Sequence, residues 1–268
     1  MKVEQLSVCL ITYNHENYIA KAIDSIFIQK TNFDYKIVIA DDCSNDNTRK
    51  IIQSYKERFP DKIDLIFQRN NVGPAQNFID LLTFPNSKYI AYLEGDDYWI
   101  DENKLQKQFD FLEKNSDFAL VHSDVKGLIG NEIIENLASK KWNSLKDETE
   151  LIDALKNPIA YSCTAFFRNV GFENYFDTNY KKLKAGDWGL WIILLCIGKA
   201  KFLDDKTAVY RVGSGVSTNN FNYNSNDYKN GFIFLFSLVF KVKKNRKIIL
   251  INALAYLKEY IRFKIKGR

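Results

Sequence analysis

The amino-acid sequence predicts an α/β protein with a mostly parallel sheet flanked by helices, followed by a basic helical extension. Three observations predict this fold class. Short apolar runs alternate with segments of helical periodicity, acidic clusters follow several of these runs, and residues 241–268 are strongly basic. Strands that alternate with helices favour a doubly wound, largely parallel sheet.

Five apolar runs are the expected strands: LSVCLI (6–11), YKIVIA (35–40), IDLIF (63–67), YIAYL (89–93) and FALVH (118–122). Helical spacing of apolar residues marks the segments between them. The expected helices lie in 16–29 and 45–59, begin near Pro74, and follow Asp101 with Leu105, Phe109 and Leu112 on one face. Proline suits the first turn of a helix.

Polar segments follow three of the expected strands, namely TYNHE, DDCSND and EGDD. Parallel sheets bind ligands outside the carboxyl ends of their strands, so the three segments should line one edge. The sequence has no GxxxxGK[ST] phosphate loop, and GSGVS near Gly213 fits neither that motif nor a dinucleotide fingerprint. A divalent cation on the EGDD carboxylates could neutralise a bound diphosphate instead. From this motif alone, solvated or helix-capping acids remain an equal alternative.

The spacing of the cysteines and the lengths of the apolar runs argue against several classes of protein. The four cysteines form no CxxC pair, which predicts neither a zinc site nor a disulfide framework and suits the reduced thiols of a cytosolic protein. The N-terminal apolar run is too short and polar for a signal peptide. No apolar run of 18 residues indicates a transmembrane helix.

The charge of the chain is uneven. Residues 241–268 contain ten Lys/Arg and one acid, Glu259, a net +9, whereas the rest of the chain carries a net −4. Basic amphipathic helices are typical of segments that bind an anionic membrane surface. The alternative is a solvated helix that packs on its own domain. Nucleic acid is not an expected partner, because no recognised binding module precedes the tail.

Four motifs together indicate a family. In order and spacing, LSVCLITYNHENYIAKAIDSIFIQ, YKIVIADDCSNDNT, NVGPAQNF and YIAYLEGDDYW resemble the inverting nucleotide-sugar glycosyltransferases of family 2. The resemblance runs from about Leu6 to Val125. It implies a GT-A type fold, a Rossmann-like α/β domain, with Mn²⁺ or Mg²⁺ at an acidic motif.

The resemblance also implies roles for the residues at the first two strand ends. Thr12, Tyr13 and Asn14 would form the loop that packs against the nucleotide base. Asp42 would accept a hydrogen bond from the base ring, and Asp41 would orient that loop. A tyrosine offers a stacking face, although Tyr13 could also be a core ring.

The EGDD motif resembles the acidic metal motif of the family. Asp97 would contact the cation, and Asp96 would reach the cation, the ribose or the sugar. Glu94 stands where an aspartate is more frequent.

A further acid is needed to take the proton of the acceptor hydroxyl. Asp187 in KAGDWGLWIILL resembles the catalytic base of the family's ED motif, and Trp188 resembles the aromatic residue that follows it at the substrate site. Gly186 replaces the usual glutamate, and Gly189 replaces a frequent acid. The alternative is that Asp187 only caps the helix.

The YRVGSGVS segment resembles a segment that lies near the metal or the diphosphate in the family. Family members often have a histidine here, where this chain has Gly213. His15 and His122 lie elsewhere in the sequence, so a histidine-assisted metal site is not expected. Arg211 could contact the diphosphate or form a structural salt bridge.

These interpretations divide the chain into a nucleotide-sugar-binding half (1–125), an acceptor-binding half (126–220) and a basic helical extension (221–268). The expected activity is inverting, metal-dependent transfer of a sugar from a UDP-sugar to a hydroxyl of a glycan or lipid-linked saccharide. Such transfer serves the synthesis of cell-surface polysaccharide, lipooligosaccharide or glycoprotein glycans. The expected location is cytoplasmic, peripheral on the inner face of the membrane.

Two other functions fit parts of the sequence. A nucleotidyltransferase also uses paired acids and a metal, but it would show a glycine-rich, Arg/Lys-bearing loop that LITYNHENY lacks. A non-catalytic nucleotide- or glycan-binding module would not need all of Asp42, Asp96, Asp97 and Asp187.

Overall fold

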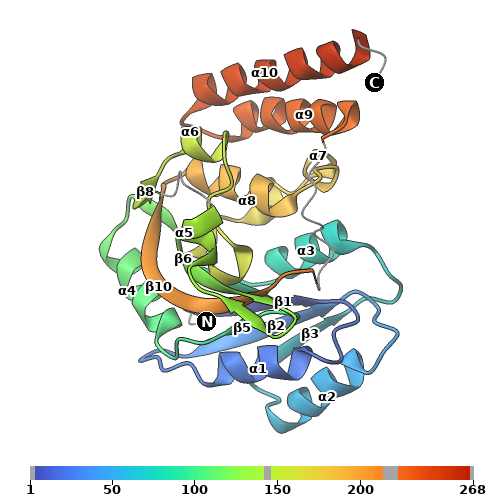
Figure 1. Ribbon diagram of the computed structural model, residues 1–268, viewed down its shortest axis with the longest axis vertical. Coiled ribbons are helices and arrows are strands. Elements are labelled where there is room, and N and C mark those ends of the chain that lie inside the picture. The colour runs from blue at the N-terminus through green and yellow to red at the C-terminus, as the bar shows by residue number, and fades with distance from the viewer. Residues whose placement is uncertain (1–3, 142–145, 214–222, 266–268) are drawn as a thin grey trace.

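The structure is a computed structural model that describes residues 4–141, 146–213 and 223–265. Within these ranges the strands form one sheet in the order β3-β2-β1-β4-β9-β6-β10-β5, with β7 beside β6 and β8 beside β10 (Figure 1). The strands are β1 (Leu6–Thr12), β2 (Tyr35–Asp41), β3 (Ile63–Phe67), β4 (Tyr89–Glu94), β5 (Tyr98–Trp99), β6 (Phe118–Ile129), β7 (Glu132–Ile134), β8 (Glu148–Thr149), β9 (Phe166–Arg168) and β10 (Lys199–Arg211).

The helices alternate with the strands in the first half and dominate the end of the chain. They are α1 (Ile19–Phe27), α2 (Thr48–Arg58), α3 (Pro74–Thr83), α4 (Lys104–Lys114), α5 (Leu137–Lys141), α6 (Leu151–Ala154), α7 (Thr178–Lys181), α8 (Gly186–Leu195), α9 (Ser225–Lys241) and α10 (Arg246–Ile265). Two short 3-10 helices, η1 (Ser162–Thr164) and η2 (Phe172–Asn174), flank β9.

All five expected strands and the four expected helices form, which confirms the predicted α/β class. β3, β2, β1 and β4 pair in parallel, as the alternating pattern predicts. The fifth run begins β6, but β6 does not pair with this parallel group. The antiparallel strand β9 lies between β4 and β6, so the sheet continues into the second half of the chain.

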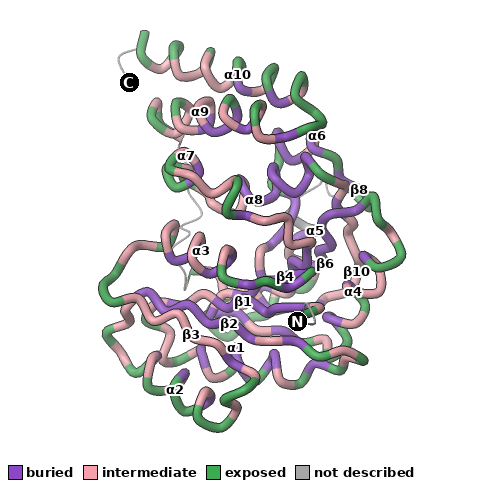
Figure 2. The backbone as a smooth tube through the Cα atoms, turned by 180° about the vertical axis from the view of Figure 1, so that it is seen from behind, coloured by how far each residue is buried: buried purple, intermediate pink, exposed green. Residues whose placement is uncertain are grey.

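The two faces of the sheet have separate cores. Val8 and Leu10 of β1 pack with residues of α1, α2 and α4, whereas Cys9 packs with residues of α3 and α8. This division follows from the alternation of side chains along a strand. Figure 2 shows the buried residues concentrated in the strands and in the inward sides of these helices.

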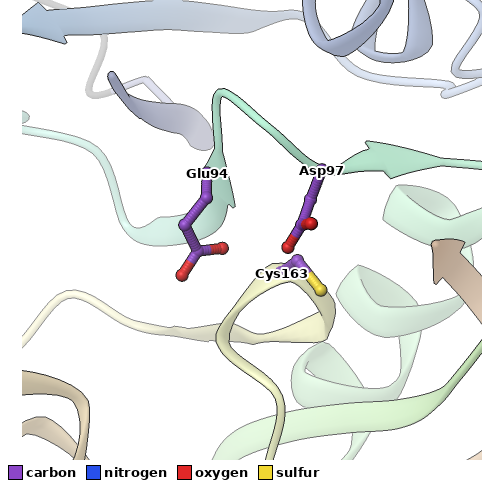
Figure 3. A group of neighbouring side chains, drawn as sticks. All are labelled: Glu94, Asp97 and Cys163. Carbon is purple, nitrogen blue, oxygen red and sulfur yellow. The ribbon is translucent and has the colours of Figure 1, made fainter. Parts of the chain in front are cut away.

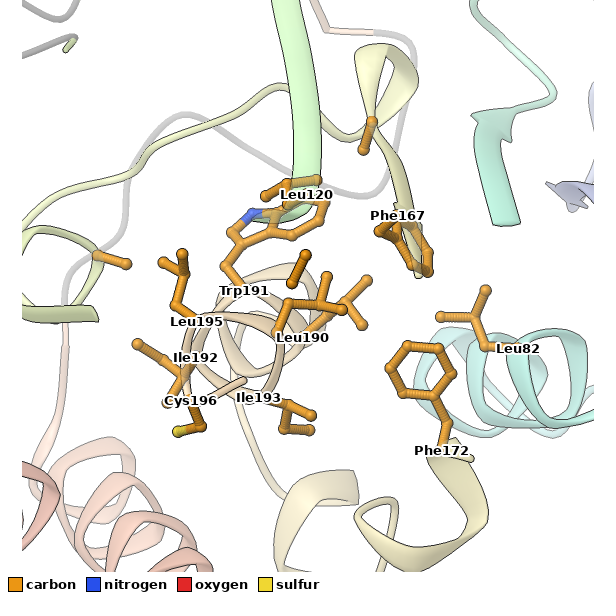
Figure 4. Packing of buried hydrophobic residues seen from close by; sticks show 14 of the residues in the cluster. Leu82, Leu120, Phe167, Phe172, Leu190, Trp191, Ile192, Ile193, Leu195 and Cys196 are labelled. Atoms are coloured by element: carbon orange, nitrogen blue, oxygen red, sulfur yellow. The ribbon is translucent and has the colours of Figure 1, made fainter. Parts of the chain in front are cut away.

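Helix α8 lies inside the second core. Every residue from Leu190 to Leu195 is buried, and the helix is apolar on all sides, as expected of a helix with no solvent face. Its side chains meet Leu120 of β6, Phe167 of β9 and Phe172 of η2 (Figure 4).

The close packing of α8 also explains the glycine at position 189. A Cβ atom there would lie 2.6 Å from Leu183 Cδ1 and 2.7 Å from Tyr180 Cε2. Any side chain at position 189 would therefore require Leu183 or Tyr180 to move.

The C-terminal extension is a pair of packed helices, α9 and α10, which lie at the top of Figure 1 beyond α7 and α8. Phe234, Leu235 and Leu238 of α9 and Ile249 and Ala253 of α10 are buried. The predicted helical extension is thus present and joined to the body by an apolar contact. The expected boundary at residue 220 lies outside the described residues. No helix in the described ranges is long and apolar enough to cross a membrane.

Candidate active site

The three polar segments predicted at the sheet edge do meet there. In the parallel register, Thr12 at the end of β1 lies opposite Asp41 of β2, and Ile11 lies opposite Glu94 of β4. The amide of Asp42 donates to Thr12 O at 3.1 Å, and the amide of Gly95 donates to Ile11 O at 2.8 Å. The backbone hydrogen bonds of the sheet therefore continue to the residues just after the strands and hold the start of each loop of the candidate site.

Asp41 organises the loop after β2. Its side chain is fully buried, accepts hydrogen bonds from the amide and hydroxyl of Ser44, and forms an ion pair with Arg49 Nε. A second guanidinium nitrogen of Arg49 donates to Gln68 O at 2.6 Å, which joins this loop to the end of β3. A buried carboxylate needs such partners, because an unpaired charge in the interior is strongly unfavourable.

Asp42 joins its own loop to the one that precedes α3. It is buried, and its Oδ1 and Oδ2 accept the amides of Val72 and Gly73 at 2.7 and 3.0 Å. Each carboxylate oxygen can accept more than one hydrogen bond. These contacts hold the carboxylate in place while leaving acceptor capacity at the strand edge.

The TYN segment adopts a turn that faces the loop after β2. Tyr13 is partly exposed, and Asn14 has a left-handed backbone with φ of 55°. The Asn14 amide donates to Ser44 Oγ at 2.9 Å, and its Oδ1 accepts the Asn45 amide at 2.8 Å. Asn14 thus fixes the two loops against each other.

The glycine of EGDD is required by close packing against the end of β1. A Cβ atom on Gly95 would lie 2.7 Å from Thr12 Oγ1 and 2.8 Å from His15 Nδ1. His15 therefore lies against the acidic turn, although the two are far apart in the sequence. Burial lowers the pKa of His15, while the nearby charge of Asp96 opposes that shift.

The acids of the turn are crowded together. Asp96 and Asp97 are buried, and the Arg211 amide donates to Asp97 Oδ1 at 2.8 Å. Glu94 Oε1 accepts a hydrogen bond from Ser162 Oγ. The other oxygens, Glu94 Oε2 and Asp97 Oδ2, are buried without a hydrogen-bond partner in the described structure.

This crowding changes the pKa values of the carboxyl groups. Burial, together with the charges of Asp96 and Asp187, raises the pKa of Glu94 to about 8. Burial and the charges of Glu94 and Asp96 raise the pKa of Asp97 well above its usual range. A positive charge at this place would favour the charged carboxylates and lower both pKa values.

Cys163 completes a cluster that the sequence did not predict. One ligand atom each from Glu94, Asp97 and Cys163 lies within 4.8 Å of the others. Figure 3 shows the Asp97 carboxylate directed toward the Cys163 side chain, which comes from η1 on the opposite side of the site. No local pattern around Cys163 signals this contact, because the two segments are distant in sequence.

A buried cation lies behind Cys163. Lys104 of α4 is fully buried, donates to Gln108 Oε1 at 2.7 Å and lies 4.4 Å from the centre of the Trp99 ring. Burial lowers the pKa of Lys104 to about 7, and the proximity of Cys163 opposes that shift. The charge of Lys104 in turn acts on the Cys163 thiol and opposes the rise of its pKa that burial causes.

Asp187 lies in the first turn of α8, and its charge acts on Glu94 and Tyr92. The helix cap itself is Ala185, so the alternative of an N-cap role for Asp187 is wrong. Its Oδ1 accepts the Trp188 amide at 2.8 Å, and burial raises its pKa. The structure therefore brings Asp187 and the acidic turn together.

Trp188 points toward the C-terminal helices. Its indole N–H donates to Ala154 O at 3.2 Å, and its ring stacks on Tyr256 of α10 with a centroid separation of 5.8 Å. The ring centre of Phe234 in α9 lies 6.0 Å from that of Trp188. These contacts make Trp188 part of the packing between α8 and the extension, a role that the motif did not indicate.

Arg211 lies at the end of β10, above the aromatic residues that flank the site. Its guanidinium lies 4.7 Å from the Tyr18 ring centre and 5.3 Å from that of Tyr98. Such stacking keeps a cation at the rim of the site. The segment after Gly213, which includes most of GSGVS, lies outside the described residues.

The fold and the acidic strand-end site define a Rossmann-like α/β protein. Residues 7–176 match the family model described as glycosyl transferase family 2, and the chain belongs to this family. An uncharacterized protein of Mycobacterium bovis is 31% identical over 209 residues, covering 77% of this chain and 58% of that protein. The chain thus spans just over half the length of that relative.

TarS of Staphylococcus aureus, named a poly(ribitol-phosphate) beta-N-acetylglucosaminyltransferase, is 29% identical over 137 residues, covering 50% of this chain and 23% of that protein. Its structure with UDP-GlcNAc superposes with a TM-score of 0.67 at 18% identity, covering 94% of this chain and 72% of that one. The mannosyltransferase PcManGT of Pyrobaculum calidifontis, solved with GDP-Man and Mn²⁺, superposes with a TM-score of 0.64 at 16% identity. The match covers 98% of this chain and 76% of that one. These likenesses confirm the predicted GT-A type fold.

Proposed function

We propose that this protein transfers a sugar from a nucleotide-diphosphate donor to an acceptor hydroxyl with inversion at the anomeric carbon. One observation carries the proposal. Acids from separate segments, Asp42 after β2, Asp97 after β4 and Asp187 on α8, gather at the carboxyl edge of one sheet. Family membership supports this function over that of a nucleotidyltransferase.

The donor side is formed by the ends of β1 and β2. Tyr13 offers a ring for base stacking, and Asp42, held by two backbone amides, offers an acceptor for a ring N–H. Uracil has such an N–H next to its carbonyl groups. The TarS structure with UDP-GlcNAc supports a uridine donor on this fold, and we propose UDP-sugar as the donor class.

The acidic turn fits a divalent cation. Within the part of the chain that the structure describes, Asp97 Oδ2 and Glu94 Oε2 are buried without hydrogen-bond partners. Carboxylate oxygens are the donors that Mg²⁺ and Mn²⁺ prefer. We propose that Asp97, with Asp96 beside it, holds this ion. Bound there, a divalent cation would stabilise the negative charge that develops on the departing diphosphate.

Asp187 is the proposed general base. Burial raises its pKa, which makes its carboxylate a stronger proton acceptor. The Trp188 amide holds Oδ1, which leaves Oδ2 to take the proton from the acceptor hydroxyl. The oxygen of that hydroxyl then bonds to the anomeric carbon as the bond to the diphosphate breaks.

A donor screen tests the proposed function. The protein is incubated with a panel of UDP-, GDP-, CMP- and dTDP-sugars, with Mn²⁺ or with EDTA, and the release of free nucleotide is measured. We expect release from a UDP-sugar, stimulated by glycan acceptors that carry free hydroxyls and abolished by EDTA. Absence of release from every donor with all acceptors would favour a non-catalytic binding module.

We further propose that the acceptor is a saccharide or polymer presented at an anionic membrane surface. Exposed apolar side chains cover α9 and α10 next to exposed cations. The apolar ones are Phe236, Phe240, Leu250, Ile251, Leu254, Ile261 and Ile265. The cations are Lys243, Lys244, Arg246, Lys247, Lys258, Arg262 and Lys264. Each cation near an anionic leaflet contributes roughly 1 kcal/mol of attraction.

Replacing Lys243, Lys244 and Lys247 with Gln should weaken binding to anionic vesicles by roughly tenfold or more. All three side chains are exposed, so the fold should persist, whereas deleting α10 would remove the buried residues Ile249 and Ala253 from the core. Vesicle sedimentation at several salt concentrations measures the effect.

The matched control replaces Lys50, Lys114 and Lys156, which are exposed on the body, with Gln. It should bind vesicles as the wild type does, and release of nucleotide with a soluble acceptor should be equal in all three proteins. Vesicle binding that ignores salt and anionic lipid would show that the basic surface is only a solvated face.

A further inference from the structure

The cluster of Glu94, Asp97 and Cys163 has a donor set that the proposed Mg²⁺ or Mn²⁺ site does not need. Its three ligand atoms lie within 4.8 Å of one another and come from β4, the turn after it, and η1. Hard cations gain little from a sulfur ligand, whereas thiolate is a preferred ligand of Zn²⁺ and related soft ions. The sulfur therefore indicates a different class of ion.

A second observation points to a ligand at this place. Asp97 is only 2% exposed, yet its Oδ2 has no hydrogen-bond partner among the described residues. The carboxylate is directed at Cys163 (Figure 3). A buried polar atom without a partner is unfavourable, and a cation coordinated by Oδ2 would remove that cost.

The geometry fits a tetrahedral ion after small movements. Bond lengths of about 2.3 Å to sulfur and about 2.1 Å to oxygen place neighbouring ligand atoms roughly 3.5 Å apart. Three protein ligands leave the fourth position open for a water or a diphosphate oxygen. Ser162 already fixes Glu94 through its other oxygen, so Glu94 Oε2 remains available.

We propose that Glu94, Asp97 and Cys163 form a site for a thiophilic divalent cation such as Zn²⁺, with Cys163 as the residue that selects it. Binding releases the thiol proton to solvent, and sulfur, as thiolate, donates an electron pair to the ion. The proposal rests on the proposed function in one respect: Asp97 serves both sites. Zn²⁺ and Mn²⁺ therefore exclude each other, and Zn²⁺ inhibits transfer.

Cobalt spectroscopy tests the site without turnover. Co²⁺ is titrated into the full chain carrying Cys43→Ser, which removes the partly exposed thiol. A thiolate-to-cobalt absorption band should appear with one equivalent and disappear when Zn²⁺ is added. Adding Cys163→Ser should abolish the band and lower Zn²⁺ affinity at least tenfold, whereas the control Cys196→Ser, at another buried thiol, should change neither.

X-ray absorption on the zinc-loaded wild-type chain removes the dependence on variants. One sulfur at about 2.3 Å from zinc is expected. A shell of oxygen and nitrogen only, or a cobalt band that survives Cys163→Ser, would overturn the proposal. Loss of Mn²⁺-dependent nucleotide release, with the cobalt band intact, would instead count against the proposed function alone.

Discussion

Asp97→Asn is expected to abolish sugar transfer, with a loss of roughly 1000-fold or more, and to remove metal-dependent donor binding. The variant retains the size of the side chain and the hydrogen bond from the Arg211 amide, but it cannot supply a charged oxygen to a cation. Nucleotide release and calorimetric titration of UDP with Mn²⁺ measure the two effects.

The stability of this variant separates function from structure. Asp97 is crowded by Glu94 and Asp96, so a neutral side chain should leave the thermal midpoint unchanged or raise it. Asp110→Asn is the matched control, because Asp110 lies on α4, where it accepts a hydrogen bond from Gln106. Wild-type transfer by Asp97→Asn would show that the proposed cation site is wrong.

Asp187→Asn should lower the transfer rate by roughly 100-fold or more while donor and metal affinities stay near the wild-type values. The amide oxygen of asparagine can still accept the Trp188 amide, so the first turn of α8 should remain intact. What the variant lacks is a basic oxygen for the acceptor proton. Single-turnover kinetics at saturating donor measure the rate, and calorimetry measures the affinities.

The pH profile gives this variant a second measurement. Burial raises the pKa of Asp187, so the wild-type rate should fall as the pH drops through that raised pKa. Asp187→Asn should lose this acidic limb, because its side chain does not titrate. A parallel loss of donor affinity would move Asp187 to the donor side, and a full rate would leave it a residue that only holds the start of α8.

Sequence patterns predicted the parts of the site that depend on strand ends. Because parallel strands share one carboxyl edge, the residues after β1, β2 and β4 had to meet, and Thr12 and Asp41 do so in register. The antiparallel insertion of β9 was not predictable in this way. Its three residues give no periodic signal, and its partners lie far away in the chain.

The contacts that the sequence patterns did not predict are side-chain contacts between segments that lie far apart in the chain. Cys163 and Ser162 reach the acidic turn only because β9 carries η1 to that edge, and Ser162 contacts Glu94 across 68 positions. His15 is far from the EGDD motif in the sequence, yet it lies next to Gly95 in the structure. The packing of Trp188 against Tyr256 depends on the extension, which follows no motif of the first half.

The central claim is that Asp97 holds the cation that binds the donor, whereas Asp187 takes the proton of the acceptor. One paired titration tests this claim most directly. The UDP-sugar that the donor screen identifies is titrated, with Mn²⁺ present, into Asp97→Asn and Asp187→Asn, and the same samples are then assayed for transfer with acceptor. We predict that Asp97→Asn loses donor binding, whereas Asp187→Asn binds donor with wild-type affinity and fails to transfer. Equal donor affinity in both variants, or equal loss in both, would contradict this claim.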